Sequence, residues 1–365
     1  MSGGTVTRLA VAAPILVVGA AIALLEGMGG RPGDGSLLMT LTFWTMLVQG
    51  CVALAAIGEV AKGLWLIPIK RDLYATYPLL LLLALLYLVM GTRMEIYAWT
   101  GHPTAWLNVQ FFIIRNVALM LLLFWVARLL AQAAMKGSPA KNTYAVVYLA
   151  LWVTSQSLIA FDWIMSLEYP WISTLFGGYF FVQSLLMGLI VSVYIIFFRT
   201  RRGANHLKET LRDCGKMILS FCFMWGGFFF AQYLVIWYGN IPEEVAYVLK
   251  RVDSAPYWGL SRAVLLMMFV IPFGALLSRA LKTHRLGMVT VSSIVLAGMA
   301  LHLLVLIRPV VPIELPRVAV ASALMAALLA FLIWRRDSFI PQQVTGEAVG
   351  GAGEAAGDLA SAHDR

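Results

Sequence analysis

Apolar segments of about 20 residues recur along most of the chain, and short polar segments separate them. A helix of this length crosses about 30 Å of hydrocarbon, whereas a barrel strand needs only about ten residues of alternating polarity. The run YPLLLLLALLYLVMG at residues 77–91 does not alternate. The pattern therefore predicts an all-α, polytopic membrane protein.

The apolar segments predict ten transmembrane helices in one integral membrane domain, residues 1–340. The helices are expected near residues 8–25, 37–58, 77–92, 106–130, 143–166, 172–198, 217–239, 257–279, 287–307 and 317–334. Residues 9–25 could also be the core of a signal peptide, but no convincing cleavage site follows, so we expect a retained first helix. The Gly- and Ala-rich segment 341–365 has no apolar period and is predicted to be a disordered cytoplasmic tail.

Composition and charge agree with a membrane protein. Of the 365 residues, 61% are hydrophobic and 12% are charged, whereas soluble domains contain about 25% charged residues. The net charge of +9 does not indicate a nucleic-acid partner, because the basic residues are divided among short loops. Alternate loops are rich in Lys and Arg, which predicts a multi-pass protein of the bacterial inner membrane with both termini in the cytoplasm.

The sequence contains no evident ligand set for a redox cofactor or a metal. Cys51, Cys214 and Cys222 lie far apart and form no CxxC or haem-attachment motif. His302 is the only histidine clearly inside a predicted span, whereas a b-type haem between helices takes two axial ligands. No P-loop, zincin spacing or nucleophile elbow is present, so we predict no catalytic residue and no metal site in this chain.

A few polar side chains inside the spans are candidate functional residues, because such groups are expensive in hydrocarbon. Tyr148, Ser155 and Asp162 are spaced seven residues apart and share one face of the fifth helix. Asp162 is either a proton-relay or quinol-side group, or one half of an ion pair that fixes helix packing. Arg115 in the fourth helix is its best-placed partner, and Arg262 in the eighth is the second candidate.

Two further helices carry polar groups that could serve either in proton transfer or in helix packing. Gln49 and Glu59 lie on one stripe of the second helix, and Glu59 stands near Lys62 at its cytoplasmic end. These groups either take up protons or form an ordinary interfacial pair. His302 in the ninth helix is either a proton carrier or a hydrogen-bonded packing residue.

The seventh helix carries a separate polar group toward its outer end. Trp225 and Gln232 share one face, and Tyr233 follows them. Their N–H and O–H groups could hydrogen-bond the oxygens of a quinone. They would also suit an ordinary interface between packed helices.

Several segments resemble one family of respiratory membrane proteins. They are WLNVQFFIIRNVALMLLLFWVARLL (106–130), FDWIMSLEYPWISTLFGGYFFVQSL (161–185), DCGKMILSFCFMWGGFFFAQYLVIWYGNIPEEVAYVLKR (213–251) and APYW (255–258). They are similar to the smaller membrane subunit, ActF, of alternative complex III, a quinol:cytochrome c oxidoreductase; this subunit belongs to the polysulfide reductase/NrfD-type superfamily. The resemblance covers about residues 40–310. It makes Asp162, Gln232 and Tyr233 residues of the family motifs, and Arg115 lies in a matching helix.

The resemblance implies an architecture and a set of partners. Helices two to five and six to nine would form two four-helix bundles, flanked by helices one and ten. The partners would be a larger paralogous membrane subunit, a periplasmic iron–sulfur subunit, multihaem and monohaem cytochromes c and membrane lipid, with a terminal oxidase as a further candidate. Menaquinol or ubiquinol, iron–sulfur clusters and c-type haems would belong to the complex, with no cofactor held by this chain. Quinol oxidation is generally assigned to the paralogue, so this subunit would scaffold the complex and could form a proton pathway.

Two other functions stay open. The chain could be the quinone-binding membrane anchor of a related polysulfide or molybdopterin reductase complex. A secondary transporter would also carry charged residues in its spans, often beside helices interrupted near the midplane. Prolines avoid the centres of the predicted spans, apart from Pro14 and Pro272 near helix ends, which disfavours a transporter.

Overall fold

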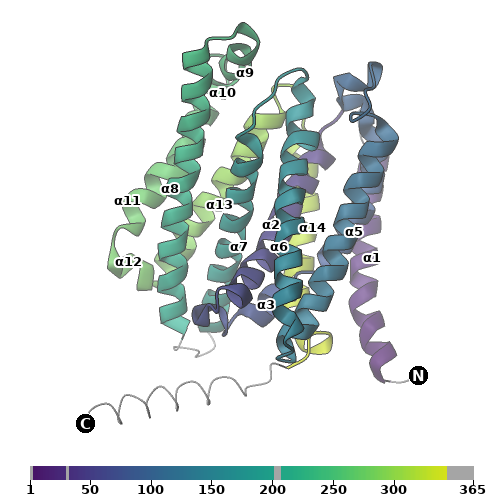
Figure 1. Cartoon of the computed structure of the whole chain (residues 1–365), viewed down its shortest axis with the longest axis vertical. Coiled ribbons are helices and arrows are strands. Elements are labelled where there is room, and N and C mark those ends of the chain that lie inside the picture. Colours follow the sequence, from purple (N-terminus) through teal and green to yellow (C-terminus); the bar gives the residue numbers. More distant parts are fainter. Residues whose placement is uncertain (1–2, 30–32, 201–206, 343–365) are drawn as a thin grey trace.

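The computed structural model describes residues 3–29, 33–200 and 207–342, and every regular element in these residues is helical (Figure 1). The longer helices are α1 (Gly3–Gly29), α2 (Ser36–Val60), α4 (Pro78–Met90), α5 (Val109–Met135), α6 (Ala140–Leu158), α7 (Phe176–Thr200), α8 (Lys208–Gly239), α13 (Arg285–Ile307) and α14 (Leu315–Trp334). The shorter ones are α3 (Lys70–Tyr74), α9 (Pro242–Val252), α10 (Tyr257–Leu265), α11 (Ile271–Leu276) and α12 (Arg279–Thr283).

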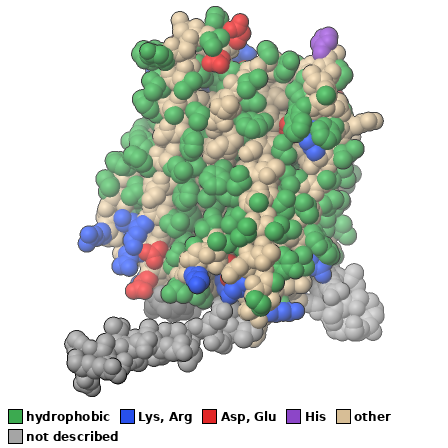
Figure 2. All heavy atoms as spheres, in the orientation of Figure 1, with side chains coloured by type: hydrophobic (Ala, Val, Ile, Leu, Met, Phe, Trp, Pro, Cys, Tyr) green, Lys and Arg blue, Asp and Glu red, His purple; other side chains and the backbone are tan. Residues whose placement is uncertain are grey.

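The prediction of a polytopic helical membrane protein is confirmed. Within the described residues, nine helical segments are long and apolar enough to cross a membrane, and α1 adds a shorter apolar stretch, Val11–Gly27. The start of α1 and the end of α14 lie at the same end of the molecule, where Lys and Arg side chains also gather (Figures 1 and 2). We call this the basic end and the opposite one the α9 end. The predicted tail, apart from its first two residues, lies outside the described residues.

α2 and α7 form the centre of the molecule. Of the residues in their most apolar segments, 94% and 83% are buried, against 17% for α8. α2 packs on α4, α6, α7 and α14, while α7 also packs on α6, α8 and α13. Where α2 and α7 cross, a Cβ atom on Gly50 would lie 1.8 Å from the backbone oxygen of Ser184, so the crossing requires glycine. The Ser184 hydroxyl donates to the Met46 carbonyl oxygen at 2.8 Å across the same crossing.

Two spans contain a π-helical turn, a feature that often marks functional sites. One follows α6 at Ile159–Ile164, and the other joins α10 to α11 at Leu266–Val270. The second turn has a local cause, because Pro272 has no N–H to donate to the carbonyl oxygen of Met268 four residues earlier. Pro272 itself lies in the first turn of α11, four residues before the span ends at Leu276. The turn beside it interrupts the span near its middle, so proline placement carries less weight against a transporter.

The segment between α8 and α10 is expected to be a loop because of its mixed charges, but it forms helix α9. Pro242 occupies the first turn together with two acidic residues, and Lys250 and Arg251 occupy the last turn. This distribution stabilises a helix, because it pairs each charge with the opposite end of the helix dipole. α9 contacts α8 and α10 at the end of the molecule that bears its name (Figure 1).

Candidate functional site

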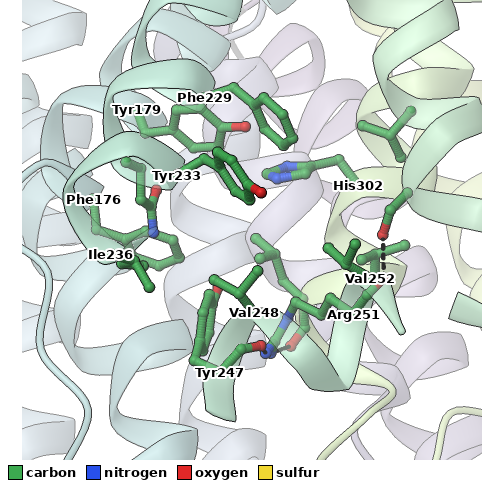
Figure 3. A pocket seen from close by; sticks show the side chains of 15 residues that line it. Phe176, Tyr179, Phe229, Tyr233, Ile236, Tyr247, Val248, Arg251, Val252 and His302 are labelled. Atoms are coloured by element: carbon green, nitrogen blue, oxygen red, sulfur yellow. Dashed lines mark hydrogen bonds between the residues drawn. The ribbon is translucent and has the colours of Figure 1, made fainter. Parts of the chain in front are cut away.

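A cavity opens between α9 and the ends of α7, α8, α10 and α13. Its volume is about 100 Å³ (Figure 3). Its apolar lining includes Phe176, Phe229, Ile236, Val248, Val264 and Leu306. Polar side chains from all five helices also line it, among them the predicted residues His302, Gln232 and Tyr233. The structure therefore gathers residues from distant parts of the sequence around one space.

His302 is almost fully buried on α13. Its Nδ1 atom lies 3.3 Å from Oε1 of Gln183. Because a carbonyl oxygen can only accept, Nδ1 carries the hydrogen in this arrangement and Nε2 is left as an acceptor. The imidazole also meets Tyr179 and Trp225 edge to face, with ring centroids 5.2 and 5.9 Å away. Trp225 thus supports His302 from behind and does not line the cavity itself.

Two buried donors that touch His302 lack a hydrogen-bond partner within the described protein. They are the indole nitrogen of Trp225 and the amide nitrogen of Gln183. A buried polar group left unpaired costs about 1–3 kcal/mol, so such groups mark places where a water molecule or a polar ligand atom is expected. The surroundings of His302 are therefore polar but incompletely satisfied.

Gln232 and Tyr233 line the cavity from α8. Gln232 is half-buried and Tyr233 is 45% exposed, so this side of the cavity is the open one. The Tyr233 hydroxyl is turned toward His302 (Figure 3). Within the described residues neither side chain has a hydrogen-bond partner, which leaves an amide and a hydroxyl available to a ligand.

Arg251 of α9 closes the cavity opposite His302, and the sequence-based reasoning missed it. Its guanidinium pairs with Glu168 and lies 3.8 Å from the ring centroid of Tyr247. It also donates to the carbonyl oxygens of Tyr247 and Leu306, at 2.8 and 2.9 Å. The available signal was the unexplained acid Glu168 in FDWIMSLEYPW, together with the basic residues that end α9.

Tyr247 ties α9 to the segment 161–171. Its ring stacks in parallel on Trp171, with centroids 3.7 Å apart. Burial raises the pKa of Tyr247 to about 12; the nearby Arg251 opposes this rise and Glu168 adds to it. The phenol therefore stays neutral at physiological pH. Glu168 and Trp171 together hold α9 over the cavity.

Asp162 belongs to a second polar cluster, between α5 and the π turn after α6. Its carboxylate accepts from Arg115 Nε at 2.8 Å, Trp106 Nε1 at 3.1 Å and Asn116 Nδ2 at 3.3 Å. Arg115 is thus the ion-pair partner. Arg262 lies outside this cluster, because its guanidinium stacks 4.6 Å from the centroid of a tryptophan ring on its own helix. This fully bonded carboxylate has the geometry of a packing anchor.

A third cluster joins α2 to α6. Gln49 Nε2 donates to Ser155 Oγ at 2.9 Å, and Gln156 Nε2 donates to Gln49 Oε1 at 2.8 Å. The Tyr148 hydroxyl donates to the Gln49 carbonyl oxygen at 3.2 Å. The structure therefore brings together three predicted residues and adds Gln156. Gln156 Oε1 and the Thr45 hydroxyl are buried there without a partner in the described protein.

Glu59 lies at the basic end and pairs with Lys70, not with the expected Lys62. Its carboxylate oxygens lie 2.9 Å from Lys70 Nζ and 3.9 Å from Lys141 Nζ. Lys62 is exposed because α2 ends at Val60 and Lys62 adopts a positive φ of 51°, which directs the chain away from the helical face that carries Glu59.

Metal ligands and known relatives give no further indication of function. In the part of the chain that the structure describes, no three His, Cys, Asp or Glu side chains are grouped so that they could hold a metal ion. Compared with known proteins, the chain matches no protein-family model and no curated protein. A functional assignment therefore depends on the cavity and the polar clusters.

Proposed function

We propose that this chain is an integral membrane subunit of a respiratory quinol:cytochrome c oxidoreductase of the alternative complex III type, and that the cavity beside α9 receives the head group of a quinol. The motif resemblance supports the type of complex. The single observation that supports quinol binding is the cavity itself, in which His302 Nε2 and the side chains of Gln232 and Tyr233 have no hydrogen-bond partner in the described residues and lie among a largely apolar lining.

A quinol head group has the chemistry that this cavity requires. It is a flat ring with oxygen atoms at opposite edges, so it needs apolar walls and two separate polar contacts. Phe229 and Phe176 form aromatic walls of the cavity. His302 Nε2 can accept a hydrogen bond from one hydroxyl, while Tyr233 and Gln232 can bond the oxygen at the opposite edge. The exposed side of Tyr233 leaves room for the isoprenoid tail to pass into the membrane.

Oxidation of a quinol to a quinone releases two electrons and two protons. In this proposal the two electrons pass one at a time to iron–sulfur or c-type haem centres of partner subunits. The resemblance implies such centres in the complex but assigns quinol oxidation to the paralogue, so the proposal adds a second quinol site in this chain. The first proton passes from the quinol hydroxyl to Nε2 of His302, where Gln183 fixes the orientation of the ring. The second leaves by the open side of the cavity.

The proposal also covers the number of membrane spans and their division into two bundles. We assign ten spans: α1, α2, α4, α5, α6, α7, α8, α10 with α11, α13 and α14. The second to fifth would form one four-helix bundle and the sixth to ninth another, with α1 and α14 at the flank; the packing of α1 on α4 and α14, and of α14 on α2, supports this division. The charge at the basic end supports a cytoplasmic location for both termini in a bacterial inner membrane.

A second role, a proton pathway through the first bundle, is favoured by a specific observation. Buried polar groups follow one another from Glu59 at the basic end, through Tyr74 at 3.5 Å, to the cluster around Gln49. Two further buried oxygens lack a partner in the described protein: Gln156 Oε1 in this cluster, and the hydroxyl of Tyr87, whose ring stacks on Trp163 next to Asp162 in the chain. Water at these atoms would connect the clusters.

Binding of a quinol analogue to the purified, detergent-solubilised chain tests the main proposal. Tyr233→Phe removes one hydrogen bond, which is worth about 0.5–1.5 kcal/mol, so we expect affinity to fall about two- to tenfold. Tyr238→Phe is the matched control, because Tyr238 is 85% exposed and lies outside the cavity. Equal affinity in all three proteins would contradict a head-group contact by Tyr233.

Co-purification in mild detergent distinguishes a complex of the alternative complex III type from one of the polysulfide reductase type. A complex of the alternative complex III type predicts multihaem cytochrome c and an iron–sulfur subunit as partners. A molybdopterin-containing partner would assign the chain to the anchor of a polysulfide reductase-type complex, with the quinol cavity retained.

A further inference from the structure

We propose that a groove between α8 and α12 at the basic end binds the head group of an anionic phospholipid. The groove has a volume of about 580 Å³ and is lined by Arg212, Lys216, Arg279 and Lys282. It lies at the corner of the molecule where basic side chains gather below a hydrophobic surface (Figure 2). The groove is at the opposite end from the quinol cavity, so this inference is independent of the proposed function.

The positive charge of the groove is poorly balanced. Asp213 bonds Lys216 at 2.8 Å, but no carboxylate of the described residues pairs with Arg212, Arg279 or Lys282. The Lys282 stem lies so close to α8 that a Cβ atom on Gly215 would be 2.8 Å from its Cγ. Its ammonium is therefore held at the junction of the two helices. Guanidinium groups bind phosphate oxygens in pairs, which suits the two arginines to a phosphodiester.

The surface above the groove fits acyl chains. Arg212, Lys216, Phe223 and Phe230 are spaced by four, seven and seven residues and therefore share one face of α8. Phe223 and Phe230 are 60% and 62% exposed. The Phe223 ring also lies 6.3 Å from that of Phe273 on α11, which widens the apolar strip. Cations at the membrane boundary followed by an aromatic strip match an anionic lipid, whereas an acidic protein segment would use only the cations.

Lipid binding to the full chain in detergent tests this proposal. The ligand is dioleoyl phosphatidylglycerol, with dioleoyl phosphatidylcholine as the uncharged comparison, and binding is measured by native mass spectrometry. The double variant Arg212→Gln/Lys282→Gln should bind phosphatidylglycerol at least about tenfold more weakly. The control Lys62→Gln/Lys136→Gln removes the same charge from exposed sites at the same end and should bind as the wild type does.

The lipid tails provide a second and independent readout. Phe223→Ala should weaken binding of the dioleoyl lipid more than binding of a dihexanoyl lipid, because only long chains reach the aromatic strip. Inorganic phosphate at millimolar concentration should not displace the dioleoyl lipid. Equal losses in the groove and control variants, equal binding of phosphatidylcholine, full displacement by phosphate, or binding of a poly-glutamate peptide in place of the lipid would each overturn the proposal.

Discussion

At the scale of single residues, the position of Asp162 within its span predicts its ion-pair partner but not its other hydrogen bonds. The carboxylate and Arg115 could be paired from the sequence, because both lie in the outer halves of consecutive spans and a buried charge requires a partner. The contributions of Trp106 and Asn116 could not be predicted. They depend on the rotation of α5 and on the path of the loop before it, which no periodicity encodes.

Replacement of Asp162 by Asn tests the role of this pair. Breaking a buried ion pair costs about 3–5 kcal/mol, since Arg115 would keep its charge without a counterion. We expect the melting temperature of D162N in detergent to fall clearly, while Asp253→Asn, on the exposed surface, leaves it unchanged. An unaltered melting temperature together with altered proton-coupled turnover would instead identify Asp162 as a proton relay.

At the scale of helices, the sequence predicts the spans well but not the contacts that position the cavity. The apolar segments predict the bounds of the long helices, with the π turn counted as part of α6, to within about five residues, because hydrocarbon demands such segments wherever the chain crosses it. The exception is α8, which begins at Lys208, nine residues before the predicted start at 217. α9 was missed because it is short and amphipathic and lies outside the apolar runs. Its position depends on Arg251 and Tyr247 meeting Glu168 and Trp171, which are about 80 residues earlier in the chain.

The crossing of α2 and α7 gives a prediction at this scale. Gly50→Ala would place a Cβ atom 1.8 Å from the Ser184 backbone oxygen, and a backbone atom cannot move aside as a side chain can. We expect a loss of at least about 3 kcal/mol, the upper end of the usual cost of overpacking. The readout is the melting temperature and the yield of monodisperse protein.

Gly227→Ala on α8 is the matched control for Gly50→Ala. No atom lies within 4 Å of a Cβ atom built at Gly227. An alanine there should be neutral or stabilise the helix by about 0.5–1 kcal/mol. A G50A protein as stable as G227A would show that α2 and α7 do not cross in this way.

At the scale of the whole molecule, the distribution of charge predicts its orientation. Cysteines introduced at Asp253 and Lys136 would lie on exposed positions at the α9 end and the basic end, respectively. A membrane-impermeant maleimide added to spheroplasts should label Asp253→Cys directly and Lys136→Cys only after permeabilisation. The native Cys51, Cys214 and Cys222 are buried and should give a low background. The reverse labelling pattern would show that the topology is the opposite of the predicted one and that the cavity lies on the cytoplasmic side.

Labelling by a photoreactive azidoquinone would reveal whether a quinol head group occupies the cavity beside α9. The label would be activated in membranes that contain the full chain, and the modified peptides would be identified by mass spectrometry. We predict modification within residues 229–236 and 247–252, and its loss when excess unlabelled quinone is present. Competable labelling confined to α2, α5 and α6, or none in this chain, would contradict the account.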